Sequence, residues 1–220
     1  MAPAVSRLRS RMPLLDLPLA ASTARLPADV RRFLREAGRR VRRVQRDGRV
    51  PAFAASDFGR VYGALREVER AGLLAGRWFC EWGSGLGAVS CLAATLGLDA
   101  WGIESEPALV RAARRLADDF GLPAEFVRGS FIPAGAEAAL TRGRDFAWLS
   151  RGGPPAYEAM GLAPEDFDLV FAYPWPDEEA LIEGLFEGHA RMGAMLLTYH
   201  ADGALRLRRL TDGKVDPVRG

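Results

Sequence analysis

The stretch Phe79-Cys80-Glu81-Trp82-Gly83-Ser84-Gly85-Leu86-Gly87-Ala88 decides the fold of this 220-residue chain. A short apolar run leads into three glycines at alternate positions, and helix-forming sequence follows them. Glycine lets the backbone turn sharply and brings main-chain N–H groups close to a ligand, while the next helix offers its positive N-terminal end. The stretch therefore predicts a strand, a nucleotide-binding turn and a helix.

The carboxylate of Glu81 restricts the kind of ligand that this turn accepts. It lies two residues before Gly83, the first of the three glycines. A pyrophosphate held against the turn would be repelled by this acid, whereas an ammonium group would be attracted. The residues therefore favour a nucleotide-like ligand whose near end is a cation.

A second acid, Glu104, lies 21 positions after Gly83 and ends the apolar run at residues 100–103. An acid at this place accepts hydrogen bonds from the hydroxyls of an adenosine ribose. The same spacing also fits a nicotinamide dinucleotide fold, because Gly83-x-Gly85-x-x-Ala88 satisfies the looser form of that fingerprint. Glu81 favours an adenosine-bearing ligand with a cationic end over a nicotinamide dinucleotide, whose pyrophosphate it would repel.

Composition places the chain among globular proteins of about one domain. Hydrophobic residues make up 49% and charged residues 26%, and the formal net charge is +2, too small to imply a polyanionic partner. The basic residues are 29 arginines and the single Lys214, which indicates coding bias more than phosphate recognition. No apolar run approaches the roughly 18 residues of a membrane span, so a cytoplasmic protein is expected. Cys80 and Cys91 are expected to be buried, without a metal.

The chain divides into three parts. Residues 1–27 contain four prolines and no sustained period, and we expect them to be a loose N-terminal segment. Residues 28–72 read as a helical extension that packs on the core, with an arginine-rich helix at 28–46 whose charged face is expected to be solvated. Residues 73–220 read as the cofactor-binding domain.

Short apolar runs alternate with helical segments through this last part, which predicts βαβ units and a mainly parallel sheet. The expected strands are 77–82, 99–103, 124–128, 167–172 and 194–199, with a weak final edge strand at 204–210; the expected helices are 86–97, 107–120 and 177–191. Part of the insertion at 143–164 is expected to cover the site. The predicted fold class is α/β, a Rossmann-like three-layer sandwich with an N-terminal helical extension and a shortened C-terminal edge.

From about Phe58 to His200 the sequence resembles the class I S-adenosylmethionine-dependent methyltransferase family. The run Glu81-x-Gly83-x-Gly85-x-Gly87 is similar to the acidic, glycine-rich first motif of that family. The resemblance implies that this run holds the methionine end of the cofactor and that Glu104 holds its ribose. Ser130, within 128–131, stands where the family usually places an aspartate that accepts from the adenine amino group.

The fourth motif is Tyr173-Pro174-Trp175-Pro176, which looks like a permuted relative of the Asn/Asp-Pro-Pro-aromatic tetrad of amino-methylating members. Tyr173 replaces the usual amide or carboxylate, so a nucleic-acid base is not the favoured acceptor. Aromatic faces stabilise a sulfonium by cation–π attraction, and Asp177, Glu178 or His200 are candidates to take a proton or hold a cationic substrate. Each of these residues also fits a structural role. The two acids stand at the start of a predicted helix, where negative charge is favourable, and His200 fits a histidine whose hydrogen bonds are made within the fold.

These inferences give a set of expected site residues. The expected cofactor-binding residues are Glu81, Trp82, Gly83, Ser84, Gly85, Gly87, Glu104, Ser130, Phe131 and Tyr173, and the expected catalytic residues are Tyr173, Trp175 and Asp177. The expected cofactor is S-adenosyl-L-methionine, with no metal.

The expected function is methyl transfer to a protein side chain or a small molecule, with nucleic acid less favoured. Two alternatives stay open. An NAD(P)-binding oxidoreductase is one, although the chain offers no Tyr-x-x-x-Lys proton relay. A non-catalytic cofactor- or partner-binding protein is the other, motivated by Ser130 and Tyr173. The sequence does not set the oligomeric state.

Overall fold

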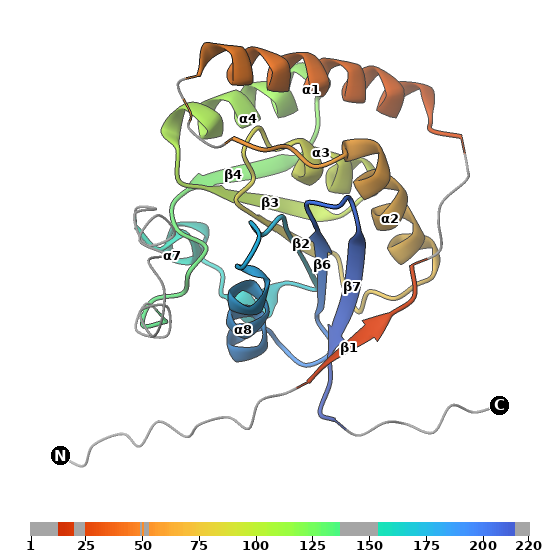
Figure 1. Ribbon diagram of the computed structural model, residues 1–220, viewed down its shortest axis with the longest axis vertical. Helices are drawn as coiled ribbons and strands as arrows, with labels where there is room; N and C mark the ends of the chain where they lie inside the picture. Colours follow the sequence, from red (N-terminus) through yellow and green to blue (C-terminus); the bar gives the residue numbers. More distant parts are fainter. Residues whose placement is uncertain (1–12, 20–24, 49, 51–52, 137–153, 214–220) are drawn as a thin grey trace.

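A seven-stranded sheet with helices on both faces forms the body of the protein (Figure 1). The structure is a computed structural model that describes residues 13–19, 25–48, 50, 53–136 and 154–213. The strand order is β1-β7-β6-β5-β2-β3-β4. The strands are β1 (Leu14–Leu17), β2 (Trp78–Trp82), β3 (Asp99–Glu104), β4 (Ala124–Arg128), β5 (Leu169–Ala172), β6 (Met195–Tyr199) and β7 (Leu205–Leu210).

The five central strands, β2 to β6, run parallel to one another, whereas β7 is antiparallel to both of its neighbours. After β2 the chain adds β3 and β4 on one side, and then returns to add β5 and β6 on the other side of β2. The order therefore reverses between β2 and β5. A crevice opens at the carboxyl ends of parallel strands at such a switch point, and ligands bind there.

The helices form two layers. They are α1 (Ala28–Asp47), α2 (Phe58–Arg70), α3 (Ala88–Thr95), α4 (Pro107–Phe120), α7 (Ala156–Met160) and α8 (Glu179–His189), with a 3-10 turn at Pro164–Asp166. Residues of α1 to α4 share one core cluster with Phe79 and Phe171, and residues of α7 and α8 share the other with Cys80 and Val170. Successive strand residues thus face opposite layers, which confirms the predicted Rossmann-like three-layer architecture.

Local sequence signals explain where these helices begin and end. Asp57 caps α2, because its carboxylate accepts from the backbone N–H groups of Gly59 and Arg60, each at 3.0 Å. Gly48 and Gly121 end α1 and α4 in the left-handed conformation. The helices and strands expected from periodicity therefore appear within about two residues of their expected bounds.

Residues 14–17 differ from the expectation that residues 1–27 form a loose segment. Residues 14–17 are not loose, because they form β1, which pairs with β7 from Leu14 opposite Leu210 to Leu17 opposite Leu207. The strand at 205–210 is accordingly an inner strand, and β1 is the edge of the sheet (Figure 1). The early chain thus completes the sheet edge that the sequence was expected to leave short.

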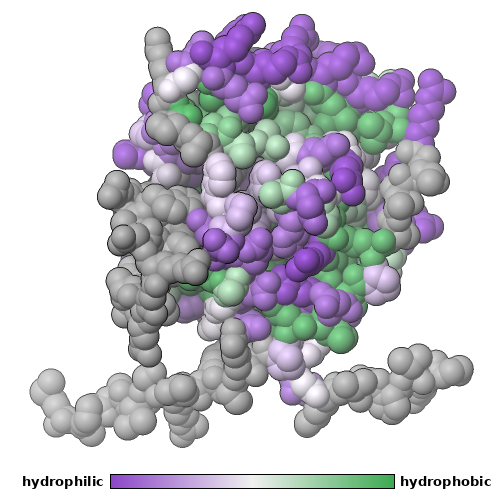
Figure 2. All heavy atoms as spheres, viewed as in Figure 1, coloured by the Kyte–Doolittle hydropathy of each residue, from purple (hydrophilic) through white to green (hydrophobic). Residues whose placement is uncertain are grey.

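The arginine-rich face of α1 lies on the surface, as expected. Figure 2 shows hydrophilic residues along the top of the molecule, where α1 lies in Figure 1. Arg40 pairs with Glu36 and with Asp119 of α4, and the Arg32 guanidinium lies 5.3 Å from the centroid of the Phe120 ring. Several of these arginines therefore fasten α1 to its own neighbours in the fold.

Candidate functional site

The glycine turn joins β2 to α3 at the switch point of the sheet. Gly83, Gly85 and Gly87 all adopt positive φ, at 71°, 54° and 70°. A residue with a side chain rarely adopts this left-handed conformation, so the turn requires glycine. The backbone N–H of Ser84 donates to the carbonyl of Ile103 at 2.8 Å, which fastens the turn to β3.

Gly87 has a packing role in this structure. A Cβ atom there would lie 2.3 Å from Cε1 of Phe126 and 2.8 Å from Cβ of Ala113. Gly87 lines neither of the two cavities at the turn. The third glycine therefore lets α3 pack closely against β4 and α4, while Gly83 and Gly85 face the ligand cavity.

The carboxyl group of Glu81 lies buried beneath the turn, with the residue only 5% exposed. One of its oxygens, Oε2, accepts hydrogen bonds from the backbone N–H of Ser90 at 2.8 Å and from the Ser90 hydroxyl at 2.6 Å. Burial raises the pKa of Glu81 to about 8, although the two hydrogen bonds from Ser90 act to lower it. The carboxyl group is therefore neutral at pH 7 in the free protein and becomes an anion when a nearby cation lowers its pKa.

Glu104 is positioned by the backbone on both sides of its carboxylate. Its Oε2 accepts from the N–H of Gly85 at 2.8 Å, and its Oε1 accepts from the N–H of Glu106 at 2.9 Å. The Ser105 hydroxyl also donates to Oε1, at 3.3 Å, so the lone pair left for a further donor lies on Oε2. The ribose-binding acid expected from the sequence is thus held at the end of β3, beside the turn and facing the cleft.

A small pocket of about 40 Å³ lies against the turn and is lined by Glu81, Gly83, Ser84 and Gly85. Its opposite wall comes from residues 53–56, the segment that precedes α2. Phe53 lies over the turn, since a Cβ atom at Gly85 would be 3.0 Å from its Cε2 atom. This wall was not found from the sequence, because the segment carries no motif and reaches the turn only through the path of α1 and α2.

A larger cleft of about 870 Å³ continues from the turn along the carboxyl ends of the strands. Trp82 and Phe131 line it and stack on each other, with ring centroids 5.2 Å apart and an angle of 7° between their planes. Ser130 lines it too, and its hydroxyl accepts from the N–H of Ile132 at 3.1 Å. The cleft joins all the expected cofactor residues except Glu81, Ser84 and Gly87, two of which line the small pocket.

Tyr173 lies where the small pocket meets the larger cleft, because it lines both. Its ring packs edge-on against Tyr199, with centroids 5.0 Å apart. Burial raises the pKa of Tyr173, so its hydroxyl stays protonated near neutral pH. Tyr173 therefore offers a neutral hydroxyl and an aromatic face at the centre of the site.

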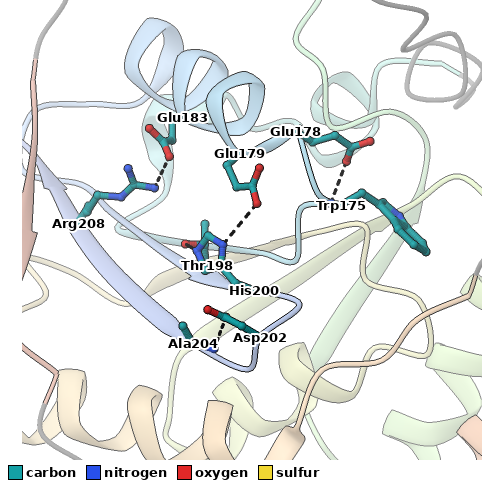
Figure 3. Close-up of polar contacts among 9 residues, drawn as sticks. All are labelled: Trp175, Glu178, Glu179, Glu183, Thr198, His200, Asp202, Ala204 and Arg208. Carbon is teal, nitrogen blue, oxygen red and sulfur yellow. Dashed lines mark hydrogen bonds and ion pairs between the residues drawn. The ribbon is translucent and has the colours of Figure 1, made fainter.

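The loop after Tyr173 is closed by two hydrogen bonds between Trp175 and Glu178. The N–H of Trp175 donates to Oε2 of Glu178 at 3.1 Å (Figure 3), and the N–H of Glu178 donates to the carbonyl of Trp175 at 3.0 Å. Asp177 between them has φ of 76°, an unusual value for a residue other than glycine. Trp175 and Glu178 line the cleft, but Asp177 is exposed and does not. Of the two acids, Glu178 faces the cleft, and the structure does not bring the expected catalytic Asp177 there.

His200 is a buried histidine held by its neighbours. Its Nε2 lies 2.8 Å from the Thr198 hydroxyl, and its Nδ1 lies 3.7 Å from Oε1 of Glu179 (Figure 3). Burial and the positive charge of Arg206 lower its pKa, although Glu179 opposes them. His200 does not line the cleft, whereas the next residue, Ala201, does. These contacts favour a structural role.

Part of the expected covering insertion at 143–164, namely 143–153, lies outside the described residues. The part that follows is described: Pro155 forms a parallel bridge with Ser130, and the N–H of Ala156 donates to the Ser130 carbonyl at 3.1 Å. The described residues contain no group of three or more possible metal ligands. Within them, no helix has the length and apolar character that a membrane crossing requires.

No protein-family model and no curated protein matches this chain. Among solved structures, it is similar to an RNA methyltransferase from Salinibacter ruber in complex with S-adenosyl-L-homocysteine, at 17% identity, 74% coverage of this chain, 97% of that chain and a TM-score of 0.48. It is also similar to a putative O-methyltransferase from Klebsiella pneumoniae, at 15% identity and a TM-score of 0.46. That match covers 80% of this chain and 66% of the other.

A third similar structure is a SAM-dependent methyltransferase from Thiobacillus denitrificans in complex with S-adenosyl-L-homocysteine, at 18% identity and a TM-score of 0.43. That match covers 80% of this chain and 56% of the other. The order and direction of its own strands carry the fold assignment. The chain has a Rossmann-like α/β fold.

Proposed function

We propose that this protein binds S-adenosyl-L-methionine and transfers its methyl group to a protein side chain or a small molecule. One observation carries the proposal: a buried carboxyl group, Glu81, lines a small pocket directly beneath two left-handed glycines. A carboxylate at that place attracts the ammonium of an amino-acid-bearing cofactor and repels a diphosphate.

The other residues of the site fit the same cofactor. Glu104 has acceptor capacity left on Oε2 for a ribose hydroxyl, because that oxygen accepts one backbone hydrogen bond from the described residues, whereas Oε1 accepts from both Glu106 and Ser105. The apolar wall of Phe131 and the Ser130 hydroxyl lie in the same cleft, on the side of β4 where an adenine would follow the ribose. A hydroxyl at position 130 replaces the usual aspartate, so we expect a weaker contact to the adenine amino group.

The chemistry of the reaction demands little from the protein beyond alignment. The bound cofactor supplies an electrophilic methyl group on a sulfonium. Tyr173 and Trp175 present aromatic faces that stabilise a positive charge and exclude water. The proline on either side of Trp175 and its two hydrogen bonds with Glu178 hold this loop in one conformation. Such positioning supplies most of the acceleration in an in-line displacement.

The charges around the site argue against the oxidoreductase alternative. None of the described residues that line the pocket and the cleft is an arginine or a lysine, although the chain has 30 basic residues. Its lining acids are Glu81, Glu104, Glu106 and Glu178. A dinucleotide pyrophosphate would meet this acidic lining with no compensating cation among the described lining residues, which disfavours NAD(P).

Calorimetric titration with S-adenosyl-L-homocysteine, the demethylated cofactor, tests cofactor binding. We expect one site per chain, and Gly85→Arg should abolish binding because its side chain would displace Phe53 and fill the small pocket. Gly188→Arg in α8 is the matched control, since a Cβ atom there meets nothing within 4 Å, and it should bind normally. Absence of binding at millimolar ligand, or retained binding in Gly85→Arg, would contradict the proposal.

Turnover needs its own experiment, because a protein that binds the cofactor without reacting would pass the titration. Small amines, small acids and peptide extracts are incubated with methyl-labelled cofactor and searched for labelled product. We expect product from at least one of these classes. Tight cofactor binding without any product would favour the non-catalytic reading that Ser130 and Tyr173 motivate.

A further inference from the structure

The cleft is acidic in a chain whose basic residues slightly outnumber its acidic ones. Three glutamates line it, and no basic side chain lies among its described lining residues. Two of these glutamates have assignments: Glu104 holds the turn and faces the ribose position, and Glu106 caps α4 by accepting from the N–H of Ala108 at 3.1 Å. Glu178 remains, on the opposite side of the cleft, where α8 begins.

Glu178 differs from an ordinary helix-start acid in its surroundings. The residue is only 5% exposed, and its carboxylate caps no N–H of α8. Among the described residues, the donor to its carboxylate is the N–H of Trp175, which bonds to Oε2 (Figure 3). The charged group that acts on it is another acid, Glu179. A buried carboxylate in such surroundings is costly unless a donor or a cation completes its bonding.

Trp175 and Tyr173, two aromatic residues, line the cleft together with Glu178. Trp175 is 41% exposed and lines the same wall, and Tyr173 lies two residues before it. Aromatic faces attract ammonium groups, and a nearby carboxylate adds charge attraction to this contact. The left-handed Asp177 lets the loop fold back so that Glu178 and Trp175 face one wall.

We propose that Glu178, Trp175 and Tyr173 form the acceptor subsite and that it selects an amine, an ammonium-bearing protein side chain or small molecule, over an anionic acceptor. This inference rests on the proposed function and names its acceptor class. Glu178 takes one proton from the bound ammonium, which frees the nitrogen lone pair. That pair forms the new nitrogen–carbon bond as the electrons of the carbon–sulfur bond return to sulfur.

The test compares two probes of similar size and opposite charge. The full chain is saturated with S-adenosyl-L-homocysteine and titrated in a calorimeter with benzylamine, which is a cation near neutral pH, and separately with benzoate. We expect benzylamine to bind at least about ten-fold more tightly than benzoate. In Glu178→Gln, we expect benzylamine affinity to fall about ten-fold. Glutamine keeps an oxygen that accepts from Trp175, so S-adenosyl-L-homocysteine affinity should stay unchanged.

Glu125→Gln is the matched control, because Glu125 is exposed on β4 and does not line the cleft. It should keep the preference for benzylamine. The proposal is overturned if benzylamine fails to bind, if benzoate binds equally well, or if Glu178→Gln retains the preference. A failure of the proposed function is seen separately, because S-adenosyl-L-homocysteine would then not bind the unaltered chain in the first titration.

Discussion

The carboxyl group of Glu81 keeps its proton in the free protein at neutral pH, because burial raises its pKa to about 8. An arriving ammonium stabilises the carboxylate and lowers that pKa. Binding of the cofactor therefore releases a proton whenever the solution is more acidic than the pKa of the free protein. The anion that selects the ligand forms together with the complex.

This coupling predicts the pH dependence of cofactor affinity. The affinity for S-adenosyl-L-homocysteine should rise by up to about ten-fold per pH unit between about pH 6 and 8, and then level off. The slope is positive because the free protein holds one more proton than the complex in this range. Calorimetry in buffers of different ionisation enthalpy should detect the released proton. Glu81→Gln should bind more weakly and show no such slope; an unchanged slope in this variant would refute the coupling.

The same carboxyl group predicts a trend in stability without ligand. The folded protein holds a proton on Glu81 up to about pH 8, whereas the unfolded chain releases it above its ordinary value of 4.5. Stability should therefore fall as pH rises between these values, by several kcal/mol from this group alone. Urea unfolding at a series of pH values measures it. The difference in stability between the unaltered chain and Glu81→Gln should change with pH in this range, and a constant difference would contradict the assignment.

Gly87 predicts a steric effect that can be separated from backbone strain. Gly87→Ala should cost about 3 kcal/mol or more, because its methyl group would overlap Phe126 and Ala113 and its φ is 70°. Gly121→Ala has a similar φ of 60° but meets nothing within 4 Å, so it should cost only about 1 kcal/mol. Chemical denaturation compares the two, and equal costs would show that the contact with Phe126 does not matter.

At the scale of elements, β1 makes a prediction about the edge of the sheet. Leu17 packs against the core cluster that α1 to α4 share, whereas Leu15 in the same strand is 53% exposed. Leu17→Glu should therefore destabilise the protein by about 1–3 kcal/mol, and Leu15→Glu should stay within about 0.5 kcal/mol. Thermal unfolding of both variants tests whether β1 is part of the folded sheet.

Most elements could be predicted from the sequence, because their apolar residues recur with a clear period over many positions. β1 could not, since four residues give too short a pattern and its pairing with β7 joins distant parts of the chain. Phe53 could not be predicted as a site residue either, because its contact with the turn joins distant parts of the chain and depends on the path of α1 and α2. The acidic first motif and Glu104 were recognisable because their spacing is local.

The choice between Asp177 and Glu178 shows another limit of sequence reasoning. Both acids follow Pro176, and composition does not distinguish them. The left-handed φ of Asp177 turns the chain so that Glu178 faces the cleft and Asp177 faces solvent. That backbone angle occurs in a loop closed by the hydrogen bonds between Trp175 and Glu178, which no sequence pattern specified.

On the scale of the whole molecule, the proposed cofactor site spans both halves of the sheet. The cleft uses residues after β2, β3 and β4 on one side and after β5 on the other. Ligand that binds only the folded protein should therefore stabilise the chain as a unit, by about 2.7 kcal/mol at one hundred times its dissociation constant. The midpoint temperature of thermal unfolding should rise when S-adenosyl-L-homocysteine is added and should stay unchanged when NADH is added. A shift with NADH alone would favour the oxidoreductase alternative.

The most direct measurement is a crystal structure of the full chain grown with both S-adenosyl-L-homocysteine and NAD. The account predicts the homocysteine end against Gly83 and Gly85 with its ammonium beside Glu81, and the ribose hydroxyls on Glu104. A diphosphate seated in the glycine turn, or a turn without ligand at saturating concentrations, would contradict it.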